Sequence, residues 1–230
     1  EYNIPKNLND SVNIDNFLNQ NKGKKVIVVQ GLGFVGAVMS LVCCNSHKEE
    51  YAVIGVDLPS ESSYWRIKSL NEGEFPLVSS DKKVYEFYEN AKNKNNFYAT
   101  FDNYAYSKAD YIIVDINLDV IKVNDEKGKL KDYDVNLNPF KNAINSIANN
   151  SKEDVVILIE TTVPPGTTKN IVKPIIEQIY FKKGYSKDKF FLGHSYERVM
   201  PGPDYVDSII NFYRVYSGVD KKSELVIEKF

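Results

Sequence analysis

The sequence predicts an α/β fold in which helices cover both faces of a doubly wound parallel sheet. Three observations support this prediction. Short apolar runs such as 25–30, 109–116 and 154–160 are almost continuous, which is typical of parallel strands buried on both faces. Segments with helical periodicity separate these runs, so strand and helix alternate along the chain. The first run ends at a glycine-rich turn, and a helix of small residues follows it.

The remaining elements follow from the same periodicities. A short helix with Ile14, Phe17 and Leu18 on one face is expected within the polar residues 1–22. Asp81 is expected to be the N-cap of a helix that ends near residue 94. The polar, aperiodic residues 117–135 predict a long loop. Strands are expected at about 25–30, 52–57, 97–100, 109–116, 154–160, 189–193 and 213–217, and further helices at about 34–46, 63–70, 138–149 and 168–180.

Composition excludes several classes of function. The net charge is −2 and the pI is about 5.8, and no basic run indicates a nucleic-acid surface. No apolar run is long enough for a membrane span or a signal peptide. The two cysteines, Cys43 and Cys44, are neighbours in the first expected helix, which fits a reducing cytoplasm. His47 and His194 are too few and too far apart to indicate a metal site.

The turn after the first strand has the pattern G-x-G-x-x-G, formed by Gly31, Gly33 and Gly36. Gly31 permits a tight turn, Gly33 lets a pyrophosphate approach the backbone, and Gly36 lets the helix lie against the strand. The helix that starts at Phe34 and Val35 directs its N-terminal N–H groups and dipole at the phosphates. A glycine turn of another βαβ unit is the alternative, but the strand–turn–helix context favours a Rossmann-type NAD(P)-binding domain.

The second strand ends at Asp57, which follows Gly36 by 21 residues. A carboxylate at this position accepts hydrogen bonds from an adenosine ribose and repels a 2′-phosphate. NAD is therefore the expected cofactor, in preference to NADP.

In such a sheet, ligands lie beyond the carboxyl ends of the strands. The residues that follow the later strands are therefore candidates for the site. These candidates are Ile116, Asn117, Glu160, Thr161, Thr162, Glu197 and Arg198. Two structural alternatives remain: the Thr-Thr-Val-Pro-Pro segment could be only a rigid helix cap, and Glu197 and Arg198 could form only a surface ion pair.

Four segments resemble the nucleotide-sugar 6-dehydrogenases, the UDP-glucose/GDP-mannose dehydrogenase family. Residues 159–168, IETTVPPGTT, are similar to the family's S-T-V-P-P-G-T loop, and residues 196–202, YERVMPG, to its P-E-R-V-x-P-G loop. Residues 67–73, IKSLNEG, resemble its I-x-x-L-N-x-G segment. With the glycines and Asp57, the resemblance extends from about residue 25 to residue 220.

This resemblance implies an enzyme that oxidises C6 of a UDP-sugar to the acid, with two NAD, through a cysteine thioester. The glycine turn, Asp57, Ile116, Asn117, Thr161 and Thr162 would hold NAD. Thr162 matches a threonine that positions the catalytic water, and Glu197 matches an acid/base carboxylate that also contacts substrate. Arg198 matches the basic residue beside it. The sequence of the loop at 196–202 is closer to the UDP-N-acetylhexosamine branch of the family. The resemblance therefore implies UDP-N-acetylmannosamine or UDP-N-acetylglucosamine as substrate, with UDP-glucose as a further candidate.

The chain also departs from the family pattern. Asp115-Ile-Asn-Leu-Asp119 stands where the family has V-P-T-P, and Tyr196 replaces a proline. The resemblance implies a helical dimerisation segment and a UDP-binding domain with the nucleophilic cysteine beyond Phe230, and Cys43 and Cys44 lie in the wrong helix to replace it. We therefore expect a polar extension at 1–22, the NAD-binding domain at 23–220 and the start of a connecting helix at 221–230. This part alone is expected to bind NAD without completing the oxidation, and the longer protein to form a homodimer.

Three other functions are alternatives to this one. A short-chain dehydrogenase needs Tyr-x-x-x-Lys, but that spacing occurs in several places, Tyr104 and Lys108 among them, and none has the required serine context. A two-electron 3-hydroxyacid dehydrogenase shares the Rossmann half and needs no catalytic cysteine. A stand-alone NAD-binding or regulatory module would suit the unusual residues at 115–119 and Tyr196.

Overall fold

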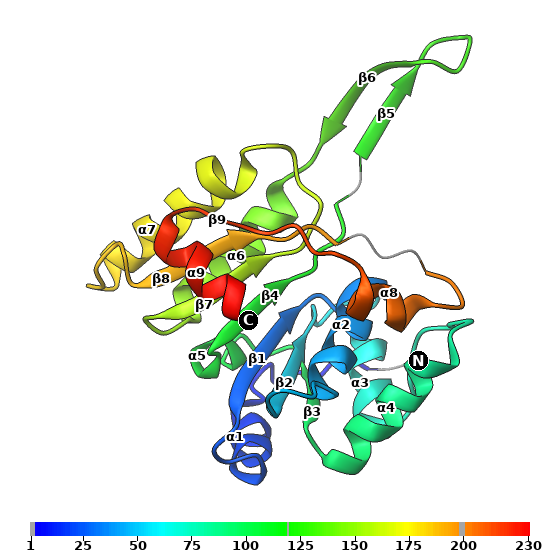
Figure 1. Cartoon of the computed structure of the whole chain (residues 1–230), viewed down its shortest axis with the longest axis vertical. Helices are drawn as coiled ribbons and strands as arrows, with labels where there is room; N and C mark the ends of the chain where they lie inside the picture. The colour runs from blue at the N-terminus through cyan, green and yellow to red at the C-terminus, as the bar shows by residue number, and fades with distance from the viewer. Residues whose placement is uncertain (1–2, 119, 198–200) are drawn as a thin grey trace.

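The structure is a computed structural model that describes residues 3–118, 120–197 and 201–230. Its main sheet has seven strands in the order β3-β2-β1-β4-β7-β8-β9 (Figure 1). All neighbouring strands are parallel except β8 and β9, which are antiparallel. The strands are β1 (Lys25–Gln30), β2 (Tyr51–Val56), β3 (Phe97–Thr100), β4 (Tyr111–Val114), β7 (Val155–Ile159), β8 (Phe190–His194) and β9 (Ser217–Gly218).

The strand order reverses between β1 and β4. The chain runs outward from β1 through β2 to β3, and then returns to place β4 on the other side of β1. Gln30 at the end of β1 is in register with both Val56 of β2 and Val114 of β4. The carboxyl ends of the three strands are therefore level, and a crevice for a ligand is expected where they diverge. The predicted doubly wound parallel sheet is confirmed.

Helices cover both faces of the sheet. Val28, Ile112 and Ile157 pack on one face, against α1 (Ser11–Gln20), α5 (Ala105–Lys108), α6 (Asn138–Asn150) and α7 (Lys173–Lys182). The alternate residues, such as Val29 and Ile113, pack on the other face. That face is covered by α2 (Phe34–Cys44), α3 (Tyr64–Glu72), α4 (Lys82–Lys94) and α8 (Tyr205–Asn211), and at β7 by α9 (Lys221–Lys229). This alternation explains why the strands are apolar throughout, because neither face is left to solvent.

The loop predicted at 117–135 is wrong for most of its length. The described part of it contains an antiparallel hairpin of β5 (Val120–Asn124) and β6 (Leu130–Val135), which projects away from the rest of the molecule (Figure 1). The turn is closed by Asp125, whose carboxylate accepts hydrogen bonds from two backbone N–H groups, and by Gly128 with φ +75°. The short β-branched runs were missed because charged and polar residues lie among them. Such residues are tolerated because neither face of the hairpin is buried.

The C-terminal elements also differ from the prediction. The last strand, expected at 213–217, is reduced to the two residues of β9. The helices α5 and α8 were not expected, since one and two turns are too short to show a periodicity. The helix after the Pro-Pro loop begins as a π-helix, η1 (Thr168–Val172). Pro174 lies where η1 passes directly into α7, since the N–H of Lys173 donates to the carbonyl oxygen of Thr168, five residues earlier. Because proline has no N–H to continue the helical hydrogen bonds, it fits the change of helix type at this point.

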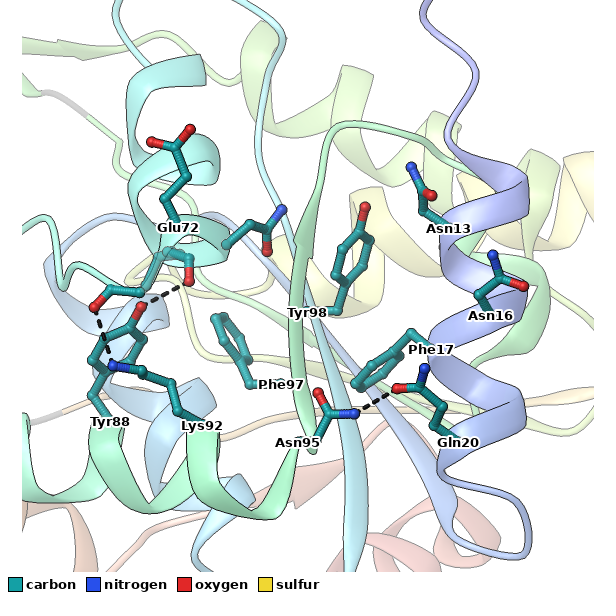
Figure 2. A pocket seen from close by; sticks show the side chains of 13 residues that line it. Asn13, Asn16, Phe17, Gln20, Glu72, Tyr88, Lys92, Asn95, Phe97 and Tyr98 are labelled. Atoms are coloured by element: carbon teal, nitrogen blue, oxygen red, sulfur yellow. Dashed lines mark hydrogen bonds between the residues drawn. The ribbon is translucent and has the colours of Figure 1, made fainter.

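The edge of the sheet at β3 is closed by a side chain. Asn71 of α3 donates from Nδ2 to the carbonyl oxygen of Ala99 at 2.7 Å, and its Oδ1 accepts from the N–H of Ala99 at 2.9 Å. The amide thus takes the place of a neighbouring strand for one residue. It lines a cavity of about 480 Å³ between α1, α3, α4 and β3, whose amide and aromatic side chains are shown in Figure 2. No predicted site residue among those described lines this cavity.

Candidate functional site

A larger cavity, of about 1190 Å³, lies at the carboxyl ends of β1, β2, β4 and β7. The structure therefore brings together residues that are far apart in the sequence. Gly36 is not among the residues that line the cavity, and Arg198 lies outside the described residues. The predicted site residues that line the cavity are Gly31, Gly33, Phe34, Val35, Asp57, Ile116, Asn117, Glu160, Thr161, Thr162 and Glu197.

Two of the glycines are required by packing. Gly31 has φ +98°, and a Cβ atom there would lie 2.2 Å from the carbonyl oxygen of Asp115. A Cβ atom on Gly36 would lie 1.9 Å from the carbonyl oxygen of Gly31. Because real Cβ contacts are never this short, only glycine lets β1, β4 and α2 approach as closely as they do.

Gly33 has a different role. It is the N-cap of α2, and a Cβ atom there would meet nothing within 4 Å. The space above it is open to the cavity, and the N–H groups of the first helical turn have no acceptor within the helix. This arrangement fits a pyrophosphate, whose oxygens would accept from these N–H groups at the positive end of the helix dipole.

Asp57 lies at the end of β2 on the wall of the cavity and is 8% exposed. Its Oδ2 accepts from the N–H of Leu32 at 3.2 Å and pairs with Arg66 Nη2 at 3.0 Å, and its Oδ1 accepts from the N–H of Leu58 at 2.8 Å. Arg66 also donates to Ser62 and Ser63. The carboxylate is thus fixed beside the glycine turn with lone pairs left for a ribose hydroxyl, while the guanidinium is held by protein acceptors.

Thr161 and Thr162 differ in what their side chains contact. The Thr161 hydroxyl donates to the carbonyl oxygen of Val114 at 3.0 Å and accepts from the N–H of Ile116 at 2.8 Å, so it ties the end of β7 to the end of β4. The Thr162 side chain is exposed and lines the cavity. Thr161 therefore fixes the wall of the cavity, whereas the Thr162 side chain is exposed to the cavity.

Arg214 connects two carboxylates that line the cavity. Its guanidinium binds Glu160, which is 2% exposed, through Nη1 at 2.5 Å, and binds Glu197 through Nη2 at 2.5 Å. Arg214 was not among the residues predicted for the site. An arginine in the otherwise apolar and aromatic segment FYRVY was the available signal, but the segment was interpreted as a strand.

Burial dominates the electrostatics of this cluster. It raises the pKa of Glu160 to about 7, although Arg214 lowers it. Burial also raises the pKa of Asp115 well above its ordinary value, and the neighbouring carboxylates of Glu160 and Glu197 raise it further. A carboxyl group that titrates near neutrality is suited to proton transfer.

Buried polar atoms without a partner gather at the same end of the sheet. Five side-chain atoms of this kind occur in residues 3–118, 120–197 and 201–230, and four of them follow or end β4, β7 and β8. An unpaired buried polar atom is costly, so it commonly marks a place where a ligand or water binds. The four atoms are Asp115 Oδ2, Glu160 Oε2, His194 Nδ1 and Ser195 Oγ.

Within residues 3–118, 120–197 and 201–230, no group of three or more His, Cys, Asp or Glu side chains could hold a metal ion. No helix in these ranges is long and apolar enough to span a membrane.

The sheet order, the glycine turn and the acidic residue at the end of β2 define a dinucleotide-binding domain of the Rossmann type. The model of the UDP-glucose/GDP-mannose dehydrogenase family, NAD binding domain, matches residues 25–229, and the chain belongs to this family. NAD is therefore its cofactor, as the acidic residue at the end of β2 predicted.

Individual relatives agree with this assignment. UDP-N-acetyl-D-mannosamine dehydrogenase of Methanocaldococcus jannaschii is 30% identical over 202 residues, which cover 87% of this chain and 40% of that protein. Protein CapL of Staphylococcus aureus is 31% identical over 192 residues, covering 84% of this chain and 39% of CapL. Among solved structures, NDP-N-acetyl-D-galactosaminuronic acid dehydrogenase from Methanosarcina mazei Go1 matches with a TM-score of 0.73 and 26% identity, over 91% of this chain and 42% of that one. The chain thus spans about two fifths of the length of these relatives.

Proposed function

We propose that this chain is the NAD-binding half of a nucleotide-sugar 6-dehydrogenase, which oxidises the C6 alcohol of a UDP-sugar to the acid. The observation that carries the proposal is the single cavity that collects the glycine turn, Asp57, Thr162 and Glu197 from four strand ends. The family match favours this reaction over that of a 3-hydroxyacid dehydrogenase relative. UDP-N-acetylmannosamine is the favoured substrate, because several relatives are named UDP-N-acetyl-D-mannosamine dehydrogenase; UDP-N-acetylglucosamine is the next candidate.

In this proposal, different residues bind the cofactor, accept the proton and position water. The N–H groups at the start of α2 bind the pyrophosphate, and Asp57 binds the adenosine ribose. NAD, when bound, supplies the hydride acceptor. Glu197, fixed by Arg214 and lining the cavity, accepts the proton that the alcohol loses, and Arg198 binds substrate beside it. Thr162 orients a water molecule for the hydrolytic step.

The nucleophilic cysteine is not one of the cysteines in this chain. Cys43 and Cys44 lie near the end of α2, and burial raises the pKa of both thiols, that of Cys43 to about 12. A thiol with such a pKa is a poor nucleophile at neutral pH. We propose that a UDP-binding domain supplies the cysteine, and that the protein which contains both halves is a cytoplasmic homodimer.

The test has two steps. This chain is first titrated with NAD⁺, and binding of one equivalent is expected. The full-length gene product is then incubated with NAD⁺ and, separately, UDP-N-acetylmannosamine, UDP-N-acetylglucosamine and UDP-glucose, and NADH is followed by its near-ultraviolet absorbance. Two NADH per sugar are expected with the true substrate. One NADH per sugar, or none with any of the three, contradicts the proposal.

A further inference from the structure

Asp115 and Glu160 are neighbours at the carboxyl edge of the sheet. Val114 of β4 is in register with Ile159 of β7, so the next residue of each strand end is one of these two carboxylic acids. Adjacent strands are about 4.8 Å apart, which places the two acidic residues side by side. Both line the large cavity, and each has one buried oxygen without a hydrogen-bond partner.

Among the described residues, this cluster contains three carboxyl groups and one cationic side chain. Asp115, Glu160 and Glu197 face Arg214, and the guanidinium pairs with the two glutamates. Two more titratable groups face the cluster, Cys43 of α2 and Tyr205 of α8. Burial raises the pKa of each of them, so they are neutral at pH 7. Because two buried carboxylates and the half-buried one of Glu197 against one guanidinium would leave uncompensated charge, the cluster retains a proton near neutral pH.

The sheet topology determines which half of a dinucleotide lies here. Asp57 at the end of β2 is on one side of the switch point between β1 and β4, and the start of α2 is at its centre. A dinucleotide with its adenosine at Asp57 and its pyrophosphate at α2 extends its other nucleoside over the ends of β4 and β7. The nicotinamide ring, which is cationic in NAD⁺ and neutral in NADH, is thereby placed toward the carboxyl cluster.

We propose that the cluster of Asp115, Glu160 and Glu197 makes NAD⁺ binding proton-linked, so that one carboxyl proton leaves to solvent as the cationic ring arrives. This inference rests on the proposed function and adds to it a preference for the oxidised cofactor. The cluster, once ionised, can take up the proton that an alcohol loses when the ring becomes neutral. NADH, whose phosphates carry the same charge as those of NAD⁺, binds without expelling the proton.

The sign of the pH dependence follows from Glu160. Burial raises the pKa of Glu160 to about 7 in the unbound protein, and a positive charge nearby lowers the pKa of a carboxyl group. Below pH 7, NAD⁺ must therefore displace a proton, and above pH 7 the carboxylate is already ionised. Affinity for NAD⁺ is expected to rise about tenfold between pH 6 and pH 8, which is the limit for one linked proton with this pKa. For NADH we expect a change below about twofold.

The experiment is a calorimetric titration of this chain with NAD⁺, NADH and ADP-ribose at both pH values. Titrations at pH 7 in two buffers with different ionisation enthalpies give the number of protons released. Because a carboxyl group with a pKa of about 7 is half protonated at pH 7, the expected result is a release of about half a proton with NAD⁺, and almost none with NADH or with ADP-ribose, which lacks the ring. Glu160→Gln is expected to bind NAD⁺ with little pH dependence. Glu153→Gln, the same change at the exposed opposite end of β7, is expected to behave like the unmodified chain.

The outcomes separate the two proposals. Equal pH responses for NAD⁺ and NADH, or an unchanged NAD⁺ response in Glu160→Gln, overturn the proton linkage and leave the proposed function standing. If none of the three ligands binds a chain that circular dichroism shows to be folded, the proposed function fails, and this inference fails with it. Asp115→Asn, which removes the neighbouring carboxyl group and is expected to weaken the pH response, replaces Glu160→Gln if that variant does not fold.

Discussion

A Cβ atom on Gly36 would lie 1.9 Å from the carbonyl oxygen of Gly31, whereas one on Gly33, two residues beyond Gly31, would touch nothing within 4 Å. The three glycines of the turn therefore serve different purposes. Gly31 and Gly36 are required by the fold itself. Gly33 is required only when something else occupies the space above the start of α2.

This difference predicts opposite outcomes for two alanine variants. Gly36→Ala must push α2 away from β1, so we expect a loss of about 3 kcal/mol or more in the free energy of unfolding. Gly33→Ala is expected to keep the stability within about 1 kcal/mol, because φ at this residue is −73°. It should nevertheless weaken NAD binding at least about tenfold, since the methyl group occupies the place of the pyrophosphate. Urea denaturation and NAD titration measure the two effects, and a Gly33→Ala chain with unchanged affinity contradicts the assignment.

The pair of Asp57 and Arg66 predicts a change of cofactor preference. Asp57→Asn removes the charge that accepts from the ribose and frees Arg66 from its ion pair. We expect NAD to bind about tenfold more weakly, which corresponds to one charge-assisted hydrogen bond, and NADP to bind better relative to NAD. Competitive titration with both cofactors measures the ratio. Glu61→Gln, an exposed change in the turn before α3, is the control, and an unchanged ratio in Asp57→Asn would count against the role of Asp57.

The two threonines after β7 are predicted to separate stability from chemistry. Thr161→Val leaves the N–H of Ile116 without its acceptor, which should lower the free energy of unfolding by about 1–3 kcal/mol. Thr162→Val changes an exposed side chain and should alter stability by less than about 0.5 kcal/mol. In the full-length enzyme, however, Thr162→Val is expected to slow the hydrolytic step and to let the bound intermediate accumulate. Thermal denaturation and quenched-flow analysis distinguish the two variants. A larger loss of stability in Thr162→Val than in Thr161→Val would refute the division of roles.

The amide of Asn71 is predicted to protect the free edge of β3. Asn71→Ala removes both hydrogen bonds to Ala99, and the expected loss in the free energy of unfolding is about 1–3 kcal/mol. Exposure of the strand edge should also promote self-association on storage. Asn149→Ala provides the control, because the Asn149 amide bonds only to its own helix, at Asn145. Equal stabilities of the two variants in urea denaturation would contradict the protection.

The buried carboxyl of Glu160 predicts how stability changes with pH. Its folded pKa of about 7 lies above the ordinary value of 4.5. Between these values the folded chain holds a proton that the unfolded chain releases, so this contribution to stability is complete below pH 4.5 and is lost as the pH rises through 7. Without cofactor, the melting temperature of Glu160→Gln should fall less than that of the unmodified chain between pH 5 and pH 8. Parallel curves for the two proteins would show that Glu160 is ionised throughout.

Much of the fold could be predicted from local patterns. Strands such as Val155–Ile159 are buried on both faces, so their apolar runs are unambiguous, and the glycine turn fixes the start of α2. The hairpin at 120–135 was missed although residues 121–124 and 133–135 alternate apolar and polar side chains, because these alternating stretches are short, lie among many charges and are not buried against the rest of the chain. The helix α8 depends on tertiary contacts: Tyr205 donates to the carbonyl oxygen of Phe34, and the N–H of Val206 donates to Asp81.

The candidate site, like the fold, could be predicted only in part. Residues just beyond strand ends, such as Asp57 after β2 and Glu197 three residues after β8, could be predicted because the carboxyl ends of parallel strands meet at one edge. Arg214 lies in a segment without regular structure and reaches Glu160 across 54 positions of the chain. No local pattern encodes that contact. The position of Thr161 was predictable, but its hydrogen bonds to Val114 and Ile116 were not, because they depend on the register of β4 and β7.

The central claim is that this chain binds NAD at the carboxyl edge of its sheet. Calorimetric titration of the chain with NAD⁺, beside Gly33→Ala at the same concentration, tests it most directly. One equivalent bound by the unmodified chain, with at least about tenfold weaker binding by a Gly33→Ala chain of equal stability, is the predicted result. A folded chain that takes up no NAD⁺, or a Gly33→Ala chain that binds it equally well, would contradict the claim.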